Sequence, residues 1–265
     1  MALSPAAHSR LGDELFEALC TRRTVAPLIE REPDIGIDDA YAISRHMLGR
    51  RQAQGERLVG KKIGVTSKAV QDMLGVHQPD FGFLTDRMQL HDGAIVSIAD
   101  AGLIQPRAEG EIAFGLKQDL RGPGVTIEDV LDATDFVSPC FEIVDSRIRD
   151  WKIAIQDTVA DNASCGVFVI GGARVNPRSL DLAAAKMDIH KNGELVASGL
   201  GSAVQGHPAA AVAWLANTLS RYDIPFLAGE IILSGSLAPL LPVVAGDRFD
   251  MRIAGLGSAS VGFEP

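Results

Sequence analysis

Residues 55–65, GERLVGKKIGV, mark the point where the pattern of the chain changes, and this change decides the fold. Before it, residues 10–54 carry apolar side chains at helical spacing, interrupted by two prolines. After it, short runs typical of strands follow one another to the end of the chain. We therefore predict a small helical N-terminal lobe over residues 1–57 and a β-rich core over residues 58–265.

The core region is predicted to be mainly strands. Besides 58–65, the strand-like runs cover residues 94–98, 107–115, 136–144, 165–170, 186–198, 230–234, 247–253 and 257–263. Within 186–198, Asn192-Gly193 predicts a type I′ hairpin turn, since both central positions need a positive φ. Because strands do not alternate regularly with long helices, a doubly wound parallel sheet is disfavoured and an α+β core with mixed sheets is predicted.

Four helices are predicted within the core region. A short one begins at Thr66 or Ser67, continues through Val70, Met73 and Leu74 and ends at Gly75. A second helix begins at the Thr126 capping box, and a third begins with Pro208 at the first helical position. A further helix is predicted from one apolar face, formed by Ile148, Trp151, Ile155 and Val159.

Composition excludes several classes of protein. The 265 residues are 46% hydrophobic and 22% charged, so the chain is expected to fold. A net charge of −9 and 5% aromatic residues disfavour nucleic-acid binding. The sequence lacks a run of about 18 uncharged apolar residues, which argues against a membrane span. Cys20, Cys140 and Cys165 are unevenly spaced and odd in number, so we predict free thiols and a cytoplasmic protein.

Acidic residues in two predicted strands are the first candidates for chemistry. Strand alternation places Arg107, Glu109 and Glu111 on one face. That face is either solvated, with Arg107 compensating the charge, or holds a cation between the carboxylates. Glu142 lies in the apolar run CFEIVD, and a buried carboxylate needs a partner. If Glu142 faces the other two glutamates, the all-oxygen site suits Mg²⁺ or Mn²⁺.

Other polar residues permit both a structural and a functional interpretation. Lys61 and Lys62 point to opposite faces of one strand, so one of them lies inward or at a rim, as an ion-pair partner or a proton-handling group. Asp80, in QPDFG, is either a turn residue or an acid/base group. Asn162 and Ser164 end a polar helix and either terminate it or border a pocket.

Together these segments resemble the 2-hydroxypenta-2,4-dienoate hydratases, also called 2-keto-4-pentenoate hydratases, of the fumarylacetoacetate hydrolase superfamily. The segments are GKKIGVTS (60–67), GVHQPDFG (75–82), QPRAEGEIAF (105–114), PCFEIVDSRIRDW (139–151), QDTVADNASCG (156–166), GHPAAAVAWLAN (206–217), AGDRF (245–249) and GLGS (255–258). The resemblance runs from about Val59 to the C-terminus, whereas the first fifty residues match loosely.

The resemblance implies a mixed β-roll core and the hydration of a 2-hydroxydienoate, or an alkyl-substituted analogue, to a 4-hydroxy-2-oxoacid in meta-cleavage degradation of aromatic compounds. It implies Mg²⁺ or Mn²⁺ on Glu109, Glu111 and Glu142, with Lys62 and Asp80 in proton transfer and with Asn162 and Ser164 beside the substrate. It also implies a homo-oligomer, either a pentamer or a decamer. The implied protein partner is either the next enzyme of the pathway, which is an aldolase, or a decarboxylase.

Three alternatives remain open at this point. A 2-oxo-3-hexenedioate decarboxylase of the same superfamily would use the same metal on a substrate with a second carboxylate. A hydrolase that cleaves a C–C bond in an acylpyruvate is weakened, because the sequence offers no convincing His/Glu pair to activate water. A non-catalytic partner that binds 2-oxoacids or stabilises a complex has no physical need for three clustered carboxylates.

Overall fold

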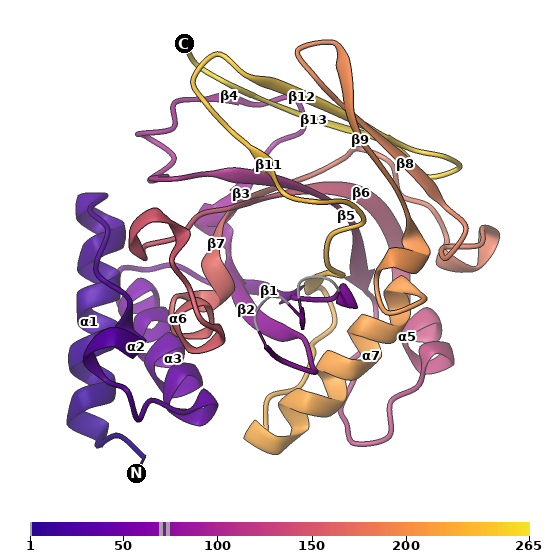
Figure 1. Ribbon diagram of the computed structural model, residues 1–265. Coiled ribbons are helices and arrows are strands. Elements are labelled where there is room, and N and C mark those ends of the chain that lie inside the picture. The colour runs from indigo at the N-terminus through magenta and orange to yellow at the C-terminus, as the bar shows by residue number, and fades with distance from the viewer. Residues whose placement is uncertain (1, 69–70, 73–74) are drawn as a thin grey trace.

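The computed structural model describes residues 2–68, 71–72 and 75–265 (Figure 1). The helices are α1 (Pro5–Thr21), α2 (Leu28–Arg31), α3 (Ile37–Ala53), α5 (Ile127–Ala133), α6 (Ile155–Ala160) and α7 (Pro208–Leu219). The strands are β1 (Leu58–Gly64), β2 (Asp80–Thr85), β3 (Gln89–Leu90), β4 (Ile95–Val96), β5 (Arg107–Leu116), β6 (Thr134–Val144), β7 (Cys165–Ile170), β8 (Lys186–Lys191), β9 (Glu194–Leu200), β10 (Ile231–Leu233), β11 (Leu241–Pro242), β12 (Arg248–Ile253) and β13 (Gly257–Phe263).

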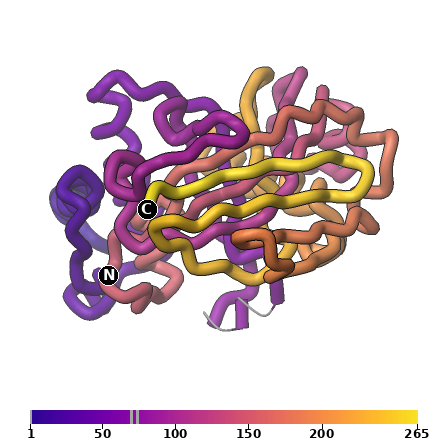
Figure 2. The backbone as a smooth tube through the Cα atoms, turned by 90° about the horizontal axis from the view of Figure 1, so that it is seen from above, coloured from indigo at the N-terminus to yellow at the C-terminus, as the bar shows by residue number. Residues whose placement is uncertain are grey.

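Among the described residues the strands form two sheets. The larger, eight-stranded sheet has the order β2-β1-β10-β5-β6-β7-β3, with β11 paired to β5. It is mixed, since β1 runs parallel to β10 whereas β5 runs antiparallel to both β6 and β10. The five-stranded sheet has the order β4-β13-β12-β8-β9 and lies across the larger sheet (Figures 1 and 2). This is the fold class that the sequence predicts, an α+β protein with a mixed β-roll core.

The two sheets pack closely at Gly110 of β5. A Cβ atom at this position would lie 2.5 Å from the Met187 sulfur and 2.8 Å from the Met251 sulfur, both in the second sheet. Beside it, the rings of Phe141 and Phe249 meet edge to face with centroids 6.3 Å apart. One face of β5 and β6 therefore packs against the second sheet, so their other residues point into the interior of the roll.

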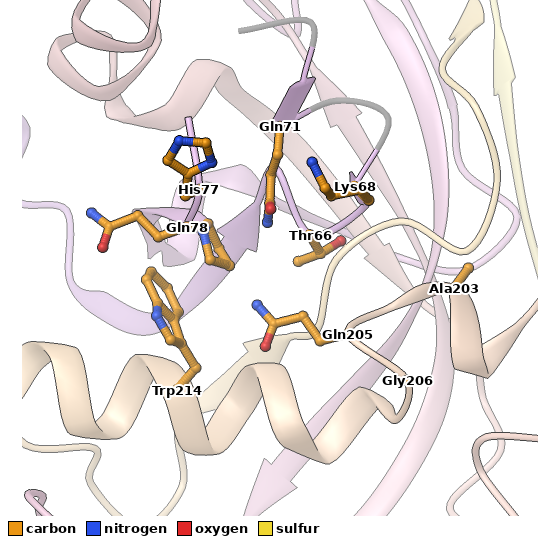
Figure 3. A pocket seen from close by; sticks show the side chains of 10 residues that line it. Thr66, Lys68, Gln71, His77, Gln78, Ala203, Gln205, Gly206 and Trp214 are labelled. Atoms are coloured by element: carbon orange, nitrogen blue, oxygen red, sulfur yellow. The ribbon is translucent and has the colours of Figure 1, made fainter. Parts of the chain in front are cut away.

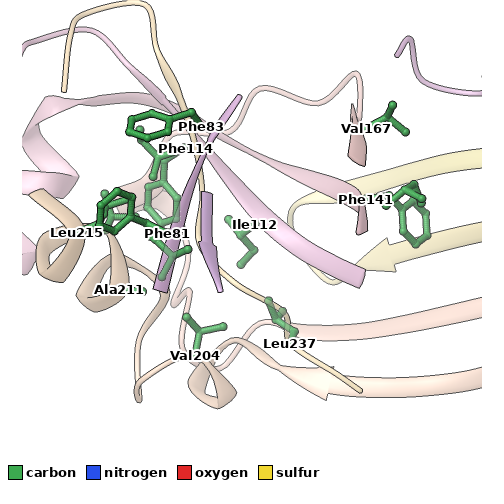
Figure 4. Packing of buried hydrophobic residues seen from close by; sticks show 14 of the residues in the cluster. Phe81, Phe83, Ile112, Phe114, Phe141, Val167, Val204, Ala211, Leu215 and Leu237 are labelled. Atoms are coloured by element: carbon green, nitrogen blue, oxygen red, sulfur yellow. The ribbon is translucent and has the colours of Figure 1, made fainter. Parts of the chain in front are cut away.

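The helices cover the roll from two sides. Helices α1–α3 lie to the left in Figure 1, next to α6, and α7 lies on the opposite side. Figure 4 places Leu215 and Ala211 of α7 among the buried side chains that pack with Phe81 and Ile112. Buried residues of α1 and α3 belong to the same apolar cluster as the core strands. The division into a 1–57 lobe and a 58–265 core stays a prediction.

The carboxylate of Asp157 ties α2 to the core. It is buried in α6 and accepts hydrogen bonds from the backbone N–H groups of Leu28 (2.6 Å) and Ile29 (3.3 Å). These two N–H groups begin α2, where the helix leaves donors without intrahelical partners. A side chain far along the chain thus caps a helix of the N-terminal region.

Most predicted strands are confirmed, and the hairpin is confirmed by a positive φ at both Asn192 and Gly193. The continuous helix predicted over 148–159 is wrong: Asp150 and Trp151 adopt left-handed backbone conformations, and α6 begins only at Ile155. Asp80, predicted in a turn, begins β2 instead.

The helix predicted from Thr66 or Ser67 to Gly75 is covered only in part by the structure. Lys68, Gln71 and Asp72 are helical, whereas Val70, Met73 and Leu74 lie outside the described residues. No helix in the described part of the chain is both long enough and apolar enough to cross a membrane.

Candidate metal centre

Three carboxylates meet on the inner face of β5 and β6. Glu109 stands directly opposite Glu142 in the antiparallel register, and Glu111 lies two residues further along β5 on the same face. One oxygen of each carboxylate lies within 4.8 Å of the others. Glu111 and Glu142 are buried, and Glu109 is half-buried. Strand register therefore brings together the three glutamates that the sequence predicts as metal ligands.

This arrangement is electrostatically unfavourable without a cation. Burial, together with the neighbouring charge of Glu142, raises the pKa of Glu109 to about 8. The same two causes raise the pKa of Glu111 well above its usual value. Like charges directly opposite in a sheet destabilise it. A bound cation would remove both penalties.

Carboxylate oxygens of the cluster that are buried without a hydrogen-bond partner fit a metal ion. Of the described side chains, Glu111 leaves its Oε1 and Glu142 leaves both carboxylate oxygens buried without a hydrogen-bond partner. The second oxygen of Glu111 is fixed by the N–H of Gly235 at 2.8 Å, which sets the orientation of the carboxylate. Buried polar atoms without partners are rare in proteins, and an all-carboxylate donor set is the kind that Mg²⁺ and Mn²⁺ prefer.

Lys62 and Asp80 lie next to the cluster. The Lys62 ammonium forms an ion pair with Glu142 at 3.3 Å. Asp80 pairs with Gly64 in the register of β1 and β2, and a Cβ at Gly64 would lie 2.3 Å from Asp80 Oδ1 and 3.3 Å from Lys62 Nζ. Glycine at position 64 therefore leaves the space in which these two side chains approach each other.

Their protonation reflects burial and mutual charge. Burial raises the pKa of Asp80 to about 6, although the Lys62 ammonium opposes this. Burial disfavours the ammonium of Lys62, but the carboxylates of Glu142 and Asp80 outweigh it and raise the Lys62 pKa. Asp80 is thus an acid that can gain or lose a proton near neutral pH.

The sequence predicts that one of the two adjacent lysines lies inward or at a rim, and in the structure both are buried. Lys61 is also buried, on the opposite face of β1, where its ammonium lies 2.6 and 2.5 Å from the two oxygens of Glu230. Burial lowers the pKa of Lys61, and the charge of Glu230 opposes this. The two lysines differ in surroundings: Lys61 has its own carboxylate, whereas Lys62 faces the acidic cluster.

Asn162 and Ser164 lie in a left-handed turn between α6 and β7. Asn162, Ala163 and Ser164 have φ values of 55°, 51° and 53°, a backbone conformation that residues other than glycine rarely adopt. The Asn162 amide accepts from the N–H of Phe83 at 2.8 Å and donates to the carbonyl of Phe83 at 2.9 Å. The Ser164 and Thr158 hydroxyls share a hydrogen bond of 3.0 Å. Both predicted substrate contacts are therefore engaged within the protein, and their role in substrate binding stays a prediction.

The structure also has a pocket of about 480 Å³, whose lining does not include the three glutamates (Figure 3). It lies between Trp214 of α7 and a wall that includes Thr66, Gln78 and Pro79. Two of its residues connect it to the metal centre: Pro79 precedes Asp80, and Thr66 packs against Gly235, whose N–H binds Glu111. The pocket is thus near the carboxylates without being lined by them.

A group of buried charged residues near the end of β6 was not predicted from the sequence. Arg147, Asp145 and Asp161 are all buried, and the Arg147 guanidinium lies 2.5 Å from Asp161 and 3.9 Å from Asp145. The available signal was the charged stretch Asp145-Ser146-Arg147 directly after an apolar strand. Sequence reasoning also missed Gly235, whose backbone orients Glu111, because a backbone donor leaves no sequence pattern.

A family model and several proteins of known activity match this chain over most of its length. The family model described as fumarylacetoacetate (FAA) hydrolase C-terminal matches residues 61–263. A 2-hydroxyhexa-2,4-dienoate hydratase of Comamonas testosteroni is 70% identical over 252 residues, which are 95% of this chain and 96% of that protein. A 2-hydroxypent-2,4-dienoate hydratase of Pseudomonas putida is 62% identical over 82% of this chain and 97% of that protein.

A solved structure is similar over nearly the whole chain. The 4-oxalocrotonate decarboxylase from Pseudomonas putida G7, complexed with magnesium and adipate, superposes with a TM-score of 0.95 at 36% identity, and covers 98% of both chains. This similarity includes the N-terminal helices, which lie outside the match to the family model.

Proposed function

The chain belongs to the fumarylacetoacetate hydrolase family, and we propose that it is a divalent-metal-dependent hydratase, a hydro-lyase that adds water to a 2-hydroxypenta-2,4-dienoate or an alkyl-substituted analogue. The product is a 4-hydroxy-2-oxoacid in the meta-cleavage degradation of aromatic compounds. The observation that carries this proposal is the cluster of three carboxylates with unpaired buried oxygens, next to a buried lysine and an aspartic acid.

Glu109, Glu111 and Glu142 are proposed to hold Mg²⁺ or Mn²⁺. The magnesium named in the related decarboxylase structure supports the first of these ions. A divalent cation bound there supplies positive charge beside the carboxylate and the 2-oxygen of the substrate, where negative charge develops. Within the protein, the N–H of Gly235 keeps the Glu111 carboxylate oriented, and Lys62 balances the charge of Glu142.

Lys62 and Asp80 are proposed to move the protons. Loss of the 2-hydroxyl proton and protonation at C5 convert the dienoate into an α,β-unsaturated 2-oxoacid. Water then adds at C4, and C3 gains a proton. The pKa of Asp80 is raised to about 6, so this side chain can exchange a proton near that pH. Lys62 supplies a charged proton donor within the same buried space. Which of the two acts as acid and which as base stays open.

A decarboxylase acting on 2-oxo-3-hexenedioate is the second candidate, favoured by the similarity to the solved 4-oxalocrotonate decarboxylase. Its substrate would place a second carboxylate at the far end of the pocket. Among the described pocket residues the cationic side chain is Lys68, which is exposed and paired with Asp72. The higher identity to the two hydratases and this lack of an unpaired cation support the hydratase.

We propose further that the protein works as a homo-oligomer, a pentamer or decamer, in the cytoplasm. The exposed apolar side chains Leu195, Val196 and Leu200 on edge strand β9 support an interface between copies. The free thiols support a reducing compartment. A 4-hydroxy-2-oxoacid is a substrate for retro-aldol cleavage, so an aldolase is the expected next enzyme, and a decarboxylase is the expected supplier of the dienoate.

The test is an assay of purified protein with fresh 2-hydroxypenta-2,4-dienoate and Mg²⁺ or Mn²⁺, with an EDTA-treated control. We expect metal-dependent loss of the diene absorbance and a product heavier by one water. Glu109→Gln is expected to abolish hydration and metal binding together. An active, metal-free Glu109→Gln variant would contradict the proposal, and release of CO₂ from 2-oxo-3-hexenedioate without dienoate turnover would assign the decarboxylase activity instead.

A further inference from the structure

The left-handed turn Asn162–Ser164 lies where the curled eight-stranded sheet comes back on itself. Strand β2 is at one edge of this sheet, and β7 lies near the other edge, next to β6. The turn leads directly into β7, and its Asn162 amide makes two hydrogen bonds to Phe83 in β2. The side chain of Asn162 therefore pairs with the edge strand as a neighbouring strand would.

Contact between the turn and β2 is close enough to require glycine. A Cβ at Gly82 would lie 2.5 Å from the carbonyl oxygen of Asn162. Gly82 pairs with Lys62 in the register of β1 and β2, and Asp80 begins the same strand. The position of the turn thus sets the position of the strand that carries Asp80.

Three consecutive non-glycine residues at positive φ must be held by their surroundings. Arg147 is 1% exposed and contacts both ends of the turn: it donates to the Asp161 carboxylate (2.5 Å), to the Asp161 carbonyl (2.6 Å) and to the Cys165 carbonyl (2.9 Å). The backbone N–H of Arg147 binds the second oxygen of Asp161 at 2.8 Å. The N–H of Asp145 in turn donates to the carbonyl of Ser164 at 2.7 Å.

Arg147 itself is fixed to the metal-binding strand. It follows β6 by three residues, and β6 carries Glu142. The guanidinium therefore connects the strand of Glu142, through the turn and Asn162, to the strand of Asp80. A lysine could keep the charge but has only one nitrogen, so it could not bind the three acceptors in this geometry.

We infer that Arg147 is a positioning residue for the reaction: by holding the left-handed turn, it fixes β2, and with it Asp80, relative to the carboxylate cluster. This inference rests on the proposed function for its kinetic consequence, while the mechanical link from Arg147 to β2 does not. The ligands on β5 and β6 are held by the sheet ladder, so Arg147 acts on Asp80 and leaves metal binding largely unchanged.

The first measurement is hydrogen exchange on the full chain of Arg147→Lys. Amides of residues 80–85 are expected to exchange at least tenfold faster than in the wild type, while those of 107–116 change less than twofold. The matched control is Arg178→Lys, the same substitution at an exposed arginine that binds the carboxylates of Glu128 and Asp132, and it is expected to leave residues 80–85 unchanged. Unchanged exchange of 80–85 in Arg147→Lys would overturn the link to β2, whether or not the protein is a hydratase.

The second measurement is kinetic and uses dienoate with Mg²⁺. Arg147→Lys is expected to lower kcat by about tenfold or more, with KM and the Kd for Mg²⁺ changed less than about threefold, because a misplaced acid/base group affects the chemical step. Arg178→Lys is expected to keep the wild-type kcat. If the wild type itself shows no turnover, the proposed function fails, and the exchange result still decides the mechanical link.

A double-mutant cycle separates positioning from a general loss of stability. The effects of Arg147→Lys and Asn162→Ala on kcat are expected to be strongly non-additive, since both break the same connection, whereas the effects of Arg147→Lys and Arg178→Lys combine additively. Additive effects in the first pair, or an unchanged kcat in Arg147→Lys, would contradict the inference. Where Arg147→Lys does not fold, Asp161→Asn replaces it in every measurement with the same expected outcomes.

Discussion

The side chains of the site are unusual individually as well as in their arrangement. Glu111, Glu142, Lys62 and Asp80 are each at most 2% exposed, yet a carboxylate or ammonium is rarely buried unless it is paired. Lys62 compensates one negative charge, and the remaining carboxylates stay uncompensated or protonated in the metal-free protein. At the scale of residues, the site therefore lacks positive charge.

Glu111→Gln tests this lack of charge. The amide keeps an acceptor for the N–H of Gly235 and removes one negative charge from the cluster. We expect the metal-free variant to unfold at no lower urea concentration than the wild type, while its affinity for Mg²⁺ falls by about 100-fold or more. Calorimetric titration and urea unfolding measure the two quantities. The exposed Glu194→Gln is the control. Unchanged affinity for Mg²⁺ in Glu111→Gln would refute the ligand role, and a lower metal-free stability would refute the repulsion between the carboxylates.

The pH dependence of stability provides a second test at this scale. The pKa values of Asp80 and Glu109 are raised to about 6 and about 8, so the folded metal-free protein binds more protons than the unfolded chain between pH 4 and 8. Its free energy of unfolding must therefore fall as the pH rises through this window. Urea unfolding at pH 5 and pH 8 in EDTA should show the decrease.

Saturating Mg²⁺ should remove most of this decrease, because the cation favours the charged carboxylates, and its affinity should rise with pH. Glu109→Gln is the control for the upper part of the window, since it removes the group with the pKa near 8. A metal-free stability that rises between pH 5 and pH 8 would show that the cluster is not protonated as described.

At the scale of elements, two kinds of local geometry place the functional groups. Strand alternation and the Glu109–Glu142 register bring the carboxylates together on regular β-structure. Positive φ values form tight connections, in the hairpin Asn192-Gly193 of the second sheet and in the turn Asn162–Ser164, which contacts the strand of Asp80. Glycine and asparagine at the hairpin are ordinary choices, whereas the second turn is held by hydrogen bonds from Arg147.

A pair of substitutions compares a glycine at positive φ in the hairpin with a glycine in a helix. Gly193→Ala, at φ 88° in the hairpin, is expected to lower the free energy of unfolding by about 1 kcal/mol, because alanine disfavours this conformation. Gly49→Ala, at an exposed position of α3 with nothing within 4 Å of the added carbon, is expected to raise it by up to about 1 kcal/mol. Urea unfolding measures both. Equal effects of the two would show that backbone conformation does not decide the cost at position 193.

At the scale of the whole molecule, the metal centre depends on the packing of two sheets. Glu109 and Glu111 point into the roll from β5, whose opposite face meets the second sheet, and Gly110 between them packs closely against that sheet. The five-stranded sheet therefore supports the strand that carries two of the three ligands. Arg147 and the left-handed turn perform the corresponding task on the side of β2.

Gly110→Ala tests the support from the second sheet. The added carbon would overlap the ends of the Met187, Ile189 and Met251 side chains, which can shift only in part. We expect a loss of stability of about 1–3 kcal/mol, as is typical of overpacked cores, together with weaker binding of Mg²⁺. Thermal unfolding and calorimetry provide the two measurements. Gly172→Ala, with open space around the added carbon, is the control and is expected to be neutral.

Much of the site could be predicted from the amino-acid sequence, because the relevant signals are local. The period of two placed Glu109 and Glu111 on one face, and the apolar run around Glu142 indicated burial. The motifs around Lys62 and Asp80 identified the family, which the match over residues 61–263 confirms. Glycine-containing turns such as Asn192-Gly193 were also predictable, because few residues accept a positive φ.

Which of these groups meet depends on the three-dimensional fold. The Glu109–Glu142 register depends on the pairing of strands that are separated by α5, and the capture of Glu111 by Gly235 depends on a backbone donor over a hundred residues away. The burial of both Lys61 and Lys62, and the break between Ile148 and Ile155, depend on charged partners and packing rather than on local propensity. Long-range contacts of this kind carry energy without a sequence period, so no local pattern could reveal them.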